Sequence, residues 1–250
     1  MELKKKLRAR ELTVGSWITI GNTAVAEIMA RAGYDWLTVD MEHSAISLEN
    51  AQELIRVIEL CGVAPLVRVG HNDPNLIKRV MDAGAHGVIV PMVNSAEEAR
   101  QAVASVKYPP RGFRGVGLAR AQKYGLDFAG YKAWNETDSV VIVQVEHIRA
   151  VENLEAILTV EGVDGFIIGP YDLSGSLGVP GQFDHPEVVA ALDRVKTVSN
   201  QLGALSGFHV IPPDREALDE KINEGYRFVA HSLDSLFLGK ACARLQTGSR

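Results

Sequence analysis

Cysteine is scarce in this 250-residue chain, because only Cys61 and Cys242 occur and they form no Cys-x-x-Cys pair. This scarcity excludes a disulfide framework and a cysteine-rich zinc site, and it favours a reducing compartment. No apolar run approaches the ~20 residues that a membrane-spanning helix requires. The basic N-terminal residues lead into further charged residues, so we expect no signal peptide. These absences predict a cytoplasmic protein without a membrane partner.

Several sequence motifs are also absent, and each absence excludes a chemistry. No glycine-rich dinucleotide or phosphate-binding loop occurs. The segment Gly175-Ser176-Leu177-Gly178 is not the Gly-x-Ser-x-Gly pattern of a serine nucleophile. No strand-like run contains the lysine that Schiff-base chemistry needs. The formal net charge of −5 argues against nucleic acid as a partner.

The chain does contain a regular alternation of short apolar runs with amphipathic stretches. Strands this apolar are typical of parallel sheets, which are buried on both faces. Eight repeats without linker composition predict a single (β/α)8 TIM barrel over residues 1–250. The predicted strands are Val14–Ile20, Asp35–Asp40, Ala64–Val69, Gly87–Val90, Ser139–Val145, Gly165–Ile168, Ala204–Gly207 and Phe228–Ala230.

Glycine marks six predicted junctions where a helix ends and a strand follows. Glycine accepts the left-handed conformation that closes a helix without a Cβ clash. Helix starts are predicted at Ser47, at Asp73-Pro74, and at Ser95 with Glu98 as a capping box. The junction glycines are Gly33, Gly62, Gly84, Gly162, Gly203 and Gly225.

Residues 107–134 interrupt the alternation of predicted strands and helices between the fourth and fifth βα units. The segment carries six basic residues against one acidic residue, Asp127. Long loops are usually functional or disordered. We therefore expect a lid or wall in which Arg114 and Arg120 attract an anionic substrate, with a subunit contact as the alternative.

Two acids stand at the ends of predicted strands, with a helix-length stretch between them. Glu146 closes the run 140–145, and Asp172 follows the run 165–168. The carboxyl ends of barrel strands share one face, where the active sites of such barrels lie. Mg²⁺ and Mn²⁺ prefer oxygen ligands and accept sites with one or two protein acids. The pair therefore predicts a metal site, although each acid alone also fits a helix N-terminus.

Two further polar groups interrupt or end apolar strands. Arg68 lies inside an apolar strand, where a guanidinium needs a carboxylate partner from the protein or a ligand. A protein partner would be Asp40 or Glu42. Asp40 and His43 are three residues apart, and an aspartate that fixes the tautomer of a histidine gives a general base. The other histidines, including His209, are expected to have surface or packing roles.

Taken together, these residues resemble the HpcH/HpaI family of class II, metal-dependent pyruvate aldolases, within the phosphoenolpyruvate/pyruvate barrel superfamily. The resemblance runs from Gly15 to the region of Asp234. It rests on Asp40-Met41-Glu42-His43, residues 77–87, Lys107-Tyr108-Pro109-Pro110-Arg111-Gly112, Gln144-Val145-Glu146 and Gly169-Pro170-Tyr171-Asp172-Leu173-Ser174. The chain departs from the pattern at Met41, at Tyr171 and at Ala230-His231-Ser232, which bears on aldehyde specificity.

The resemblance implies reversible cleavage of a 4-hydroxy-2-oxo acid, of the 4-hydroxy-2-oxoheptanedioate or 2-keto-3-deoxy sugar acid type, to pyruvate and an aldehyde. Glu146 and Asp172 would hold Mg²⁺, Mn²⁺ or a similar divalent ion such as Co²⁺. Arg68 would face the keto oxygen, His43 with Asp40 would be the acid/base pair, and Gln144 would lie beside the substrate. Backbone amides near Gly169 and Asp172, next to Tyr171, would receive its carboxylate.

The resemblance also implies a homo-oligomer, often a hexameric trimer of dimers, in which the last helix packs on or exchanges with a neighbour. Three other functions stay open: an acyl-CoA hydroxy-acid lyase, a phosphonopyruvate-type hydrolase, and a non-catalytic barrel. The tripeptide Gln144-Val145-Glu146 favours an aldolase that acts on a free acid. The presence of the acid pair, the arginine and the histidine argues against a non-catalytic barrel. The apolar residues of the last helix are Leu233, Leu236, Phe237, Ala241 and Leu245.

Overall fold

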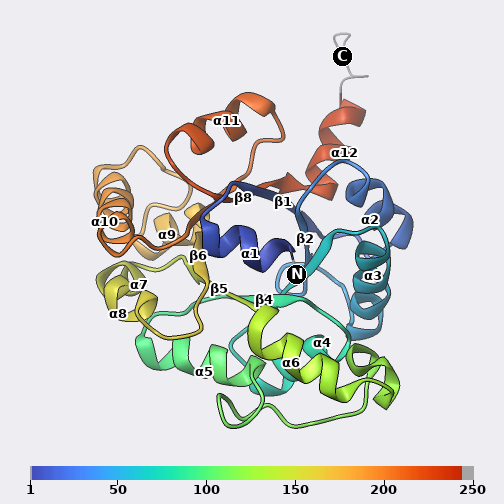
Figure 1. Cartoon of the computed structure of the whole chain (residues 1–250). Helices are drawn as coiled ribbons and strands as arrows, with labels where there is room; N and C mark the ends of the chain where they lie inside the picture. Colours follow the sequence, from blue (N-terminus) through green and yellow to red (C-terminus); the bar gives the residue numbers. More distant parts are fainter. Residues whose placement is uncertain (1, 244–250) are drawn as a thin grey trace.

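The computed structural model describes residues 2–243 of the protein. Eight parallel strands close into a barrel in chain order, so the predicted (β/α)8 fold is confirmed. Figure 1 shows the strands at the centre with the helices arranged around them. The strands are β1 (Thr13–Ile18), β2 (Trp36–Asp40), β3 (Ala64–Arg68), β4 (Gly87–Val90), β5 (Val140–Val145), β6 (Gly165–Ile168), β7 (Ser206–Val210) and β8 (Phe228–Leu233).

The helices between the strands form the outer layer of the barrel. Their apolar residues pack against the outward-facing residues of the strands in one continuous core. No helix within residues 2–243 is long and apolar enough to span a bilayer. The helices are α2 (Thr23–Ala30), α3 (Leu48–Leu60), α4 (Pro74–Asp82), α5 (Ala96–Val106), α6 (Phe128–Asp138), α7 (Ile148–Glu152), α8 (Leu154–Leu158), α9 (Pro170–Ser176), α10 (Pro186–Leu202) and α11 (Arg215–Asn223).

The predicted turn chemistry is present at the ends of the helices. All six junction glycines have φ between 59° and 104°, in the left-handed region where a side chain would be strained. Ser47, Asp73 and Ser95 each accept a hydrogen bond from the backbone N–H three residues later. The capping box at Ser95 is incomplete, because the Glu98 carboxylate accepts from the N–H of Asn94 instead, at 2.5 Å.

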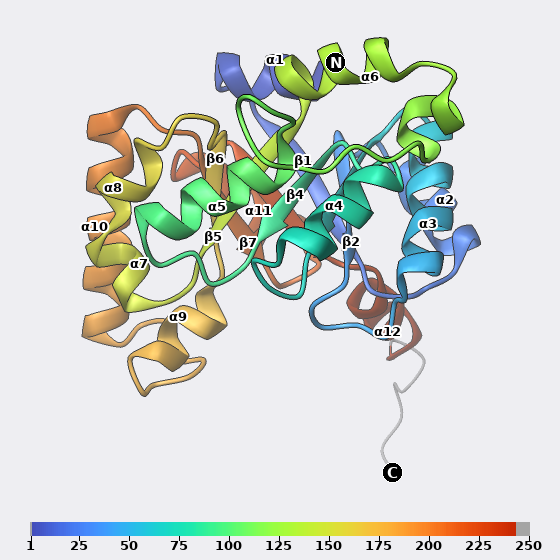
Figure 2. The same ribbon diagram turned by 90° about the horizontal axis from the view of Figure 1, so that it is seen from below.

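One further helix, α1 (Glu2–Ala9), precedes the first strand, and the sequence had not indicated it. Leu3 and Leu7 of α1 are buried with the side chains of the barrel interior. Lys4 is also buried, donates to the Ser139 carbonyl at 2.8 Å and pairs with Asp164. Figure 2 shows α1 and α6 at one end of the barrel and α9 at the opposite end. The interior is therefore closed by α1 at the N-terminal ends of the strands.

Strand β7 differs most from its predicted range. The sequence indicated residues 204–207, whereas the strand runs from Ser206 to Val210. Strand β8 likewise extends past Ala230 to Leu233. The difference places His209 inside a barrel strand rather than in a following loop.

Gly15 in β1 provides space for the stacked aromatic pair at the centre of the barrel. Trp36 and Phe228 lie 4.2 Å apart between ring centroids, and their ring planes differ by 7°. A Cβ atom on Gly15 would lie 2.0 Å from the Trp36 ring. Neither ring can move away easily in a closed, densely packed interior.

We therefore expect Gly15→Ala to lower the free energy of unfolding by at least roughly 1–3 kcal/mol, the usual cost of overpacking. Gly239→Ala is the matched control, because an added Cβ there meets nothing within 4 Å. An exposed helical glycine replaced by alanine is expected to be neutral or to stabilise by up to about 1 kcal/mol. Denaturant titration of both variants tests this, and a Gly15→Ala midpoint equal to that of the wild type would contradict it.

The basic segment 107–134 is partly helical. It contains the short 3-10 helix η1 (Arg120–Gly125) and the first part of α6. Arg114 is buried and donates to the Asp82 carboxylate at 2.5 Å and to the Tyr131 hydroxyl at 2.9 Å. Arg120 pairs with Glu59 and donates to the Ala83 carbonyl at 3.0 Å. The expectation that these two arginines attract substrate is therefore wrong, because internal partners hold both of them.

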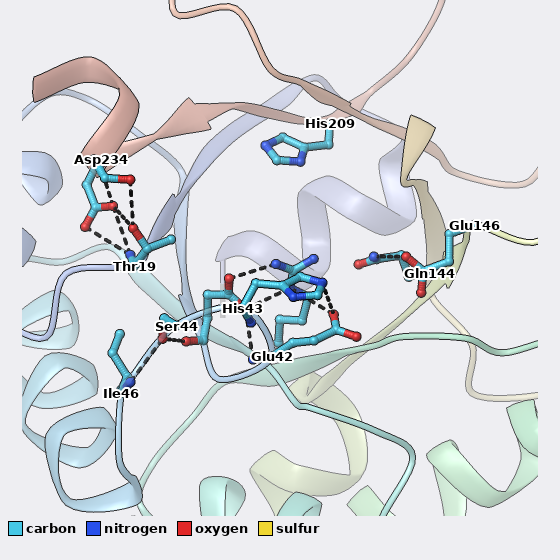
Figure 3. A network of polar contacts seen from close by, with 12 residues as sticks. Thr19, Glu42, His43, Ser44, Ile46, Gln144, Glu146, His209 and Asp234 are labelled. Carbon is cyan, nitrogen blue, oxygen red and sulfur yellow. Dashed lines mark hydrogen bonds and ion pairs between the residues drawn. The ribbon is translucent and has the colours of Figure 1, made fainter. Parts of the chain in front are cut away.

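The final described helix, α12 (Asp234–Ala243), follows β8 directly. The Asp234 carboxylate accepts from the backbone N–H groups of Thr19 and Ile20, which ties α12 to the end of β1 (Figure 3). Figure 1 shows α12 pointing away from the strands. Leu238 and Ala241 are exposed, whereas Leu236 and Phe237 are partly buried; Leu245 lies outside the described residues.

Candidate active site

A buried ion pair joins the ends of β2 and β3. The strand register places Asp40 beside Arg68. Arg68 Nε donates to Asp40 Oδ1 at 2.9 Å, and Arg68 Nη2 donates to Asp40 Oδ2 at 2.7 Å. Of the partners expected for Arg68, Asp40 is therefore the principal one, with Glu42 Oε2 at 3.4 Å from Nε. Burial opposes ionisation of Asp40, but Arg68 and two backbone N–H groups outweigh it and hold the pKa below its ordinary value.

Arg68 keeps hydrogen-bonding capacity beyond this pair. Its guanidinium lies over the indole of Trp17, 4.4 Å from the ring centroid, which fixes its plane. A guanidinium has five N–H donors, and the Asp40 pair uses two of them. No hydrogen bond links Nη1 to another residue in 2–243. Because Arg68 lines the cavity described below, its free donors can reach a bound oxygen atom.

Asp40 contacts His43 through the backbone and not through the imidazole. Its Oδ1 accepts from the N–H groups of Glu42 and His43, at 3.0 and 3.3 Å. The acid nearest to the imidazole is Glu42, with Oε2 at 3.9 Å from Nε2. The His43 side chain is 64% exposed. The expected Asp40–imidazole hydrogen bond is therefore not formed, because Arg68 occupies that carboxylate.

Three acids approach one another at the C-terminal ends of the strands. Glu146 directly follows β5 and Asp172 lies in the first turn of α9, as the sequence predicted. Glu42, which follows β2, is the third. Burial, together with the charges of Glu42 and Asp172, raises the pKa of Glu146 to about 7. Burial likewise raises the pKa of Glu42 to about 7. Such an arrangement of acids is stabilised by a cation.

Glu146 is positioned by two fixed donors. Its Oε1 accepts from the backbone N–H of Met92 at 2.7 Å, and its Oε2 accepts from the amide of Gln144 (Figure 3).

Gln144 Oε1 and Glu42 Oε2 are buried without a hydrogen-bond partner within residues 2–243. The charged neighbour of Glu42 Oε2 is Arg68, whose Nε lies 3.4 Å away. Buried oxygens without a hydrogen bond favour an external partner, either a cation or a donor on a ligand. Although the three acids interact electrostatically, no three His, Cys, Asp or Glu side chains within residues 2–243 are grouped so that they could hold one metal ion together. A metal ion on Glu146 and Asp172 would therefore keep positions for water and substrate.

The segment 169–172 forms the rim beside these acids. A Cβ on Gly169 would lie 3.0 Å from Glu146 Oε2, so a side chain here would crowd this carboxylate. The Gly169 N–H donates to the Val145 carbonyl at 3.2 Å and is not available to a ligand. Outside helix α9, the N–H groups of Tyr171 and Asp172 form no hydrogen bond to a residue in 2–243, so these amides at its first turn can receive a carboxylate. Tyr171 is exposed, and its ring meets Phe183 edge to face at 5.0 Å.

A cavity of about 140 Å³ joins these groups at the C-terminal end of the barrel. Six of the predicted site residues line it: His43, Arg68, Gln144, Gly169, Tyr171 and Asp172. Asp40 and Glu146 are not in its wall, but they hold Arg68 and Gln144 in place. The structure therefore brings the predicted site residues together around one small cavity.

Comparison with known proteins agrees with this geometry. The family model described as HpcH/HpaI aldolase/citrate lyase matches residues 13–241. The chain belongs to this family. The resemblance noted in the sequence is thus confirmed, and membership makes the protein a carbon–carbon lyase.

Characterised relatives and solved structures of HpcH/HpaI proteins match nearly the whole chain. A pyruvate aldolase of Rhizobium etli is 40% identical, with 97% of this chain and 94% of that protein covered. A hydroxypyruvate/pyruvate aldolase of Sagittula stellata is also 40% identical, covering 95% and 93%. The crystal structure of an HpcH/HpaI aldolase/citrate lyase family protein from Burkholderia cenocepacia matches with a TM-score of 0.92 at 35% identity, covering 98% and 97%.

Several residues at this HpcH/HpaI site were not predicted as site residues, although Glu42 had been considered as a partner of Arg68 and His209 as a surface or packing residue. Trp17 and Ile211 line the cavity as apolar wall, and Glu42 adds the third acid. His209 also lines the cavity, from within β7. Strand alternation could have indicated His209 if the boundary of β7 had been known, because Gly207 and His209 point to the same face.

Proposed function

We propose that this protein is a divalent-metal-dependent aldolase that reversibly cleaves a 4-hydroxy-2-oxo acid to pyruvate and an aldehyde. The observation that carries the proposal is the cavity that Arg68, Gln144 and Asp172 line together, with Glu146 held directly behind Gln144. The names of the relatives from Rhizobium etli and Sagittula stellata support the same chemistry.

Glu146 and Asp172 fit a divalent cation. Both are oxygen donors, and burial, with the charges of Glu42 and Asp172, raises the pKa of Glu146, which a bound cation would offset. Mg²⁺ and Mn²⁺ are the ions that such a donor set favours, and Co²⁺ is a further candidate. When bound, the ion supplies Lewis-acid stabilisation of negative charge on the substrate oxygens.

The residues of the site bind the substrate and move the proton in the remaining steps. The free N–H donors of Arg68 bind the keto oxygen and stabilise the negative charge that develops there when the C3–C4 bond breaks. His43, at the more exposed edge of the cavity, removes the proton of the C4 hydroxyl directly or through a water molecule. The Asp172 N–H receives the substrate carboxylate, and Gln144 lies beside it. Asp40 holds Arg68 in its fixed orientation.

Deuterium exchange into the methyl group of pyruvate tests the enolate half of this reaction without knowledge of the aldehyde. We expect exchange with Mg²⁺ or Mn²⁺, and its loss after addition of EDTA, measured by NMR. Catalysis of exchange requires a stabilised enolate, which the ion and Arg68 together provide. No exchange with any divalent ion would contradict the proposal and would favour an acyl-CoA lyase, a hydrolase or a non-catalytic barrel.

The proposal includes a homo-oligomer. The exposed side chains of Leu238 and Ala241 on α12, a helix that points away from its own barrel (Figure 1), support packing against a neighbouring subunit. A cytoplasmic location also remains part of the proposal.

A further inference from the structure

His209 is a cavity residue that the proposed aldol steps leave unused. It lies on β7 and lines the cavity together with Trp17 of β1, Arg68 of β3 and Gln144 of β5. Side chains from alternate strands form one layer in the interior of such a barrel. Figure 3 shows His209 and Gln144 in the same view of the barrel mouth. His209 is therefore the fourth member of the layer that lines the cavity.

Contacts within this layer run from His209 to Arg68 through Trp17. The His209 ring lies against the indole of Trp17, with 5.2 Å between ring centroids. The guanidinium of Arg68 lies over the same indole, 4.4 Å from its centroid. Trp17 is buried, and a buried ring in a closely packed interior cannot shift without moving its neighbours. A displacement of the indole would therefore be transmitted to the guanidinium.

The other end of this chain of contacts is anchored at β8. His209 Nε2 lies 3.4 Å from the carbonyl oxygen of Ser232, which only accepts, so the contact places a hydrogen on Nε2. Ser16 Oγ donates to the same carbonyl at 3.3 Å. The pairing of β1 with β8 is irregular between Gly15 and Trp17. These side-chain contacts therefore tie His209 and the strand of Trp17 to β8 at a point where the backbone pairing is interrupted.

The His209 ring carries no charge at this place. Burial, together with the positive charge of Arg68, lowers the pKa of His209 to about 3. An imidazolium here would repel the guanidinium and compete with it for the Asp40 carboxylate. The neutral ring instead packs on Trp17 and leaves the ion pair of Arg68 with Asp40 undisturbed.

The guanidinium of Arg68 needs support on its face as well as on its edge. Asp40 accepts from Nε and Nη2, which fixes the edge. The indole of Trp17 covers one face and so limits the tilt of the guanidinium. Supporting contacts have to hold a catalytic group within roughly 0.5 Å of its productive geometry. A misplaced donor stabilises a developing oxyanion much less, because that stabilisation depends on preorganisation.

We propose that Trp17 and His209 are positioning residues that act on the reaction through Arg68. His209, anchored to Ser232, holds the indole in place, and the indole fixes the plane of the guanidinium whose free N–H donors bind the keto oxygen. The inference rests on the proposed aldolase function and adds two residues to its site. Neither residue has to touch the substrate for this role.

Double-mutant cycles on metal-dependent deuterium exchange into pyruvate test the route through Arg68. Trp17→Leu and His209→Leu are each measured alone and combined with Arg68→Lys, at saturating Mg²⁺. We expect kcat to fall about 10²-fold in Trp17→Leu and about tenfold in His209→Leu, with KM for pyruvate within about threefold of the wild type. Each loss should shrink to less than about threefold beside Arg68→Lys, because the group to be positioned is then already absent.

Conservative variants and a control in the barrel interior separate positioning from folding. Trp17→Phe retains an aromatic face for the guanidinium, and His209→Gln retains a donor for the Ser232 carbonyl. Each should show a smaller loss of kcat than the leucine variant, of about threefold to tenfold. Trp36→Phe is the matched control, because Trp36 is a buried tryptophan that stacks on Phe228 and is not part of the cavity wall. It should lower the free energy of unfolding while kcat stays within about threefold of the wild type.

The NMR signal of the Arg68 Nε–H group gives a readout that is independent of turnover. This proton lies in the hydrogen bond to Asp40, and the guanidinium lies over the indole ring, so its chemical shift reports their relative orientation. The signal is assigned by its loss in Arg68→Lys. We expect it to shift or broaden in His209→Leu and to stay unchanged in Trp36→Phe.

The possible results are distinguishable. Equal losses of kcat with and without Arg68→Lys would overturn the inference, because Trp17 and His209 would then act on the substrate directly or through folding. An unchanged Arg68 signal in folded His209→Leu would overturn the role of His209. If the leucine variants fail to fold, wild-type kcat and an unchanged Arg68 signal in Trp17→Phe and His209→Gln would overturn the inference. Absence of metal-dependent exchange in the wild-type protein would overturn the aldolase function and this inference with it.

Discussion

Glu146→Gln is expected to reduce metal-dependent deuterium exchange into pyruvate by about 10³-fold or more. Glutamine has the same shape and keeps an oxygen for the Met92 N–H, but it removes the negative charge of a predicted metal ligand. The loss of Lewis-acid stabilisation is worth several kcal/mol, and each 1.36 kcal/mol changes a rate tenfold. The measurement is the exchange rate as a function of Mg²⁺ concentration, together with Mg²⁺ affinity by calorimetry.

A folding control separates loss of function from loss of structure. Because burial raises the pKa of Glu146 to about 7, the ionised carboxylate destabilises the metal-free fold at a pH above this value. We therefore expect the free energy of unfolding of metal-free Glu146→Gln at pH 8 to be no lower than that of the wild type. Glu155→Gln, on an exposed glutamate of α8, is the matched substitution and should retain exchange. Wild-type exchange in Glu146→Gln would exclude its role as a ligand.

Arg68→Lys is expected to lower the exchange rate by about 10²–10³-fold, the usual cost of removing one preorganised donor to a developing oxyanion. Lysine keeps the positive charge but cannot reproduce the two parallel hydrogen bonds to Asp40 or the stacking on Trp17. Steady-state exchange rates at saturating Mg²⁺ measure the effect. A Lys variant with the wild-type rate would remove Arg68 from the mechanism.

The ion pair allows the catalytic and structural contributions of Arg68 to be separated. Arg68→Met leaves the buried Asp40 carboxylate without its partner, and we expect it to lower the free energy of unfolding by about 3–5 kcal/mol. Adding Asp40→Asn removes the unpaired charge and should restore most of this stability while exchange stays low. Denaturant titrations of the two single variants and the double variant form the cycle. Recovery of exchange in the double variant would show that Arg68 acts only through folding.

The sequence predicted the barrel because its evidence was local and repeated. Apolar runs that alternate with amphipathic stretches indicate buried parallel strands and covering helices. The junctions require a positive φ, which is strained for residues other than glycine. All six junction glycines have a positive φ in the structure. Acids at the ends of such strands must lie on one rim, which is why Glu146 and Asp172 were found together.

The sequence could not predict pairings that depend on rotamers and on competition between partners. Asp40 was predicted both to hold the His43 imidazole and to be, with Glu42, a possible partner of Arg68. The sequence could not choose between these pairings, and in the fold Arg68 on the next strand holds the carboxylate. Arg114 and Arg120 were assigned to substrate from the local excess of positive charge. Asp82 and Glu59, far away in the chain, neutralise them in the fold.

By itself, the sequence determined the (β/α)8 barrel, the rim on which the site lies and half of the residues that line the cavity, since these follow from periodicity, turn chemistry and strand order. Only the tertiary structure decided which carboxylate each arginine binds, brought Glu42 to the acid pair and placed His209 in the wall. These depend on the register of neighbouring strands and on contacts between residues distant in the chain. A shift in the end of one strand, β7, was enough to conceal a cavity residue, because the face to which each side chain points alternates along a strand.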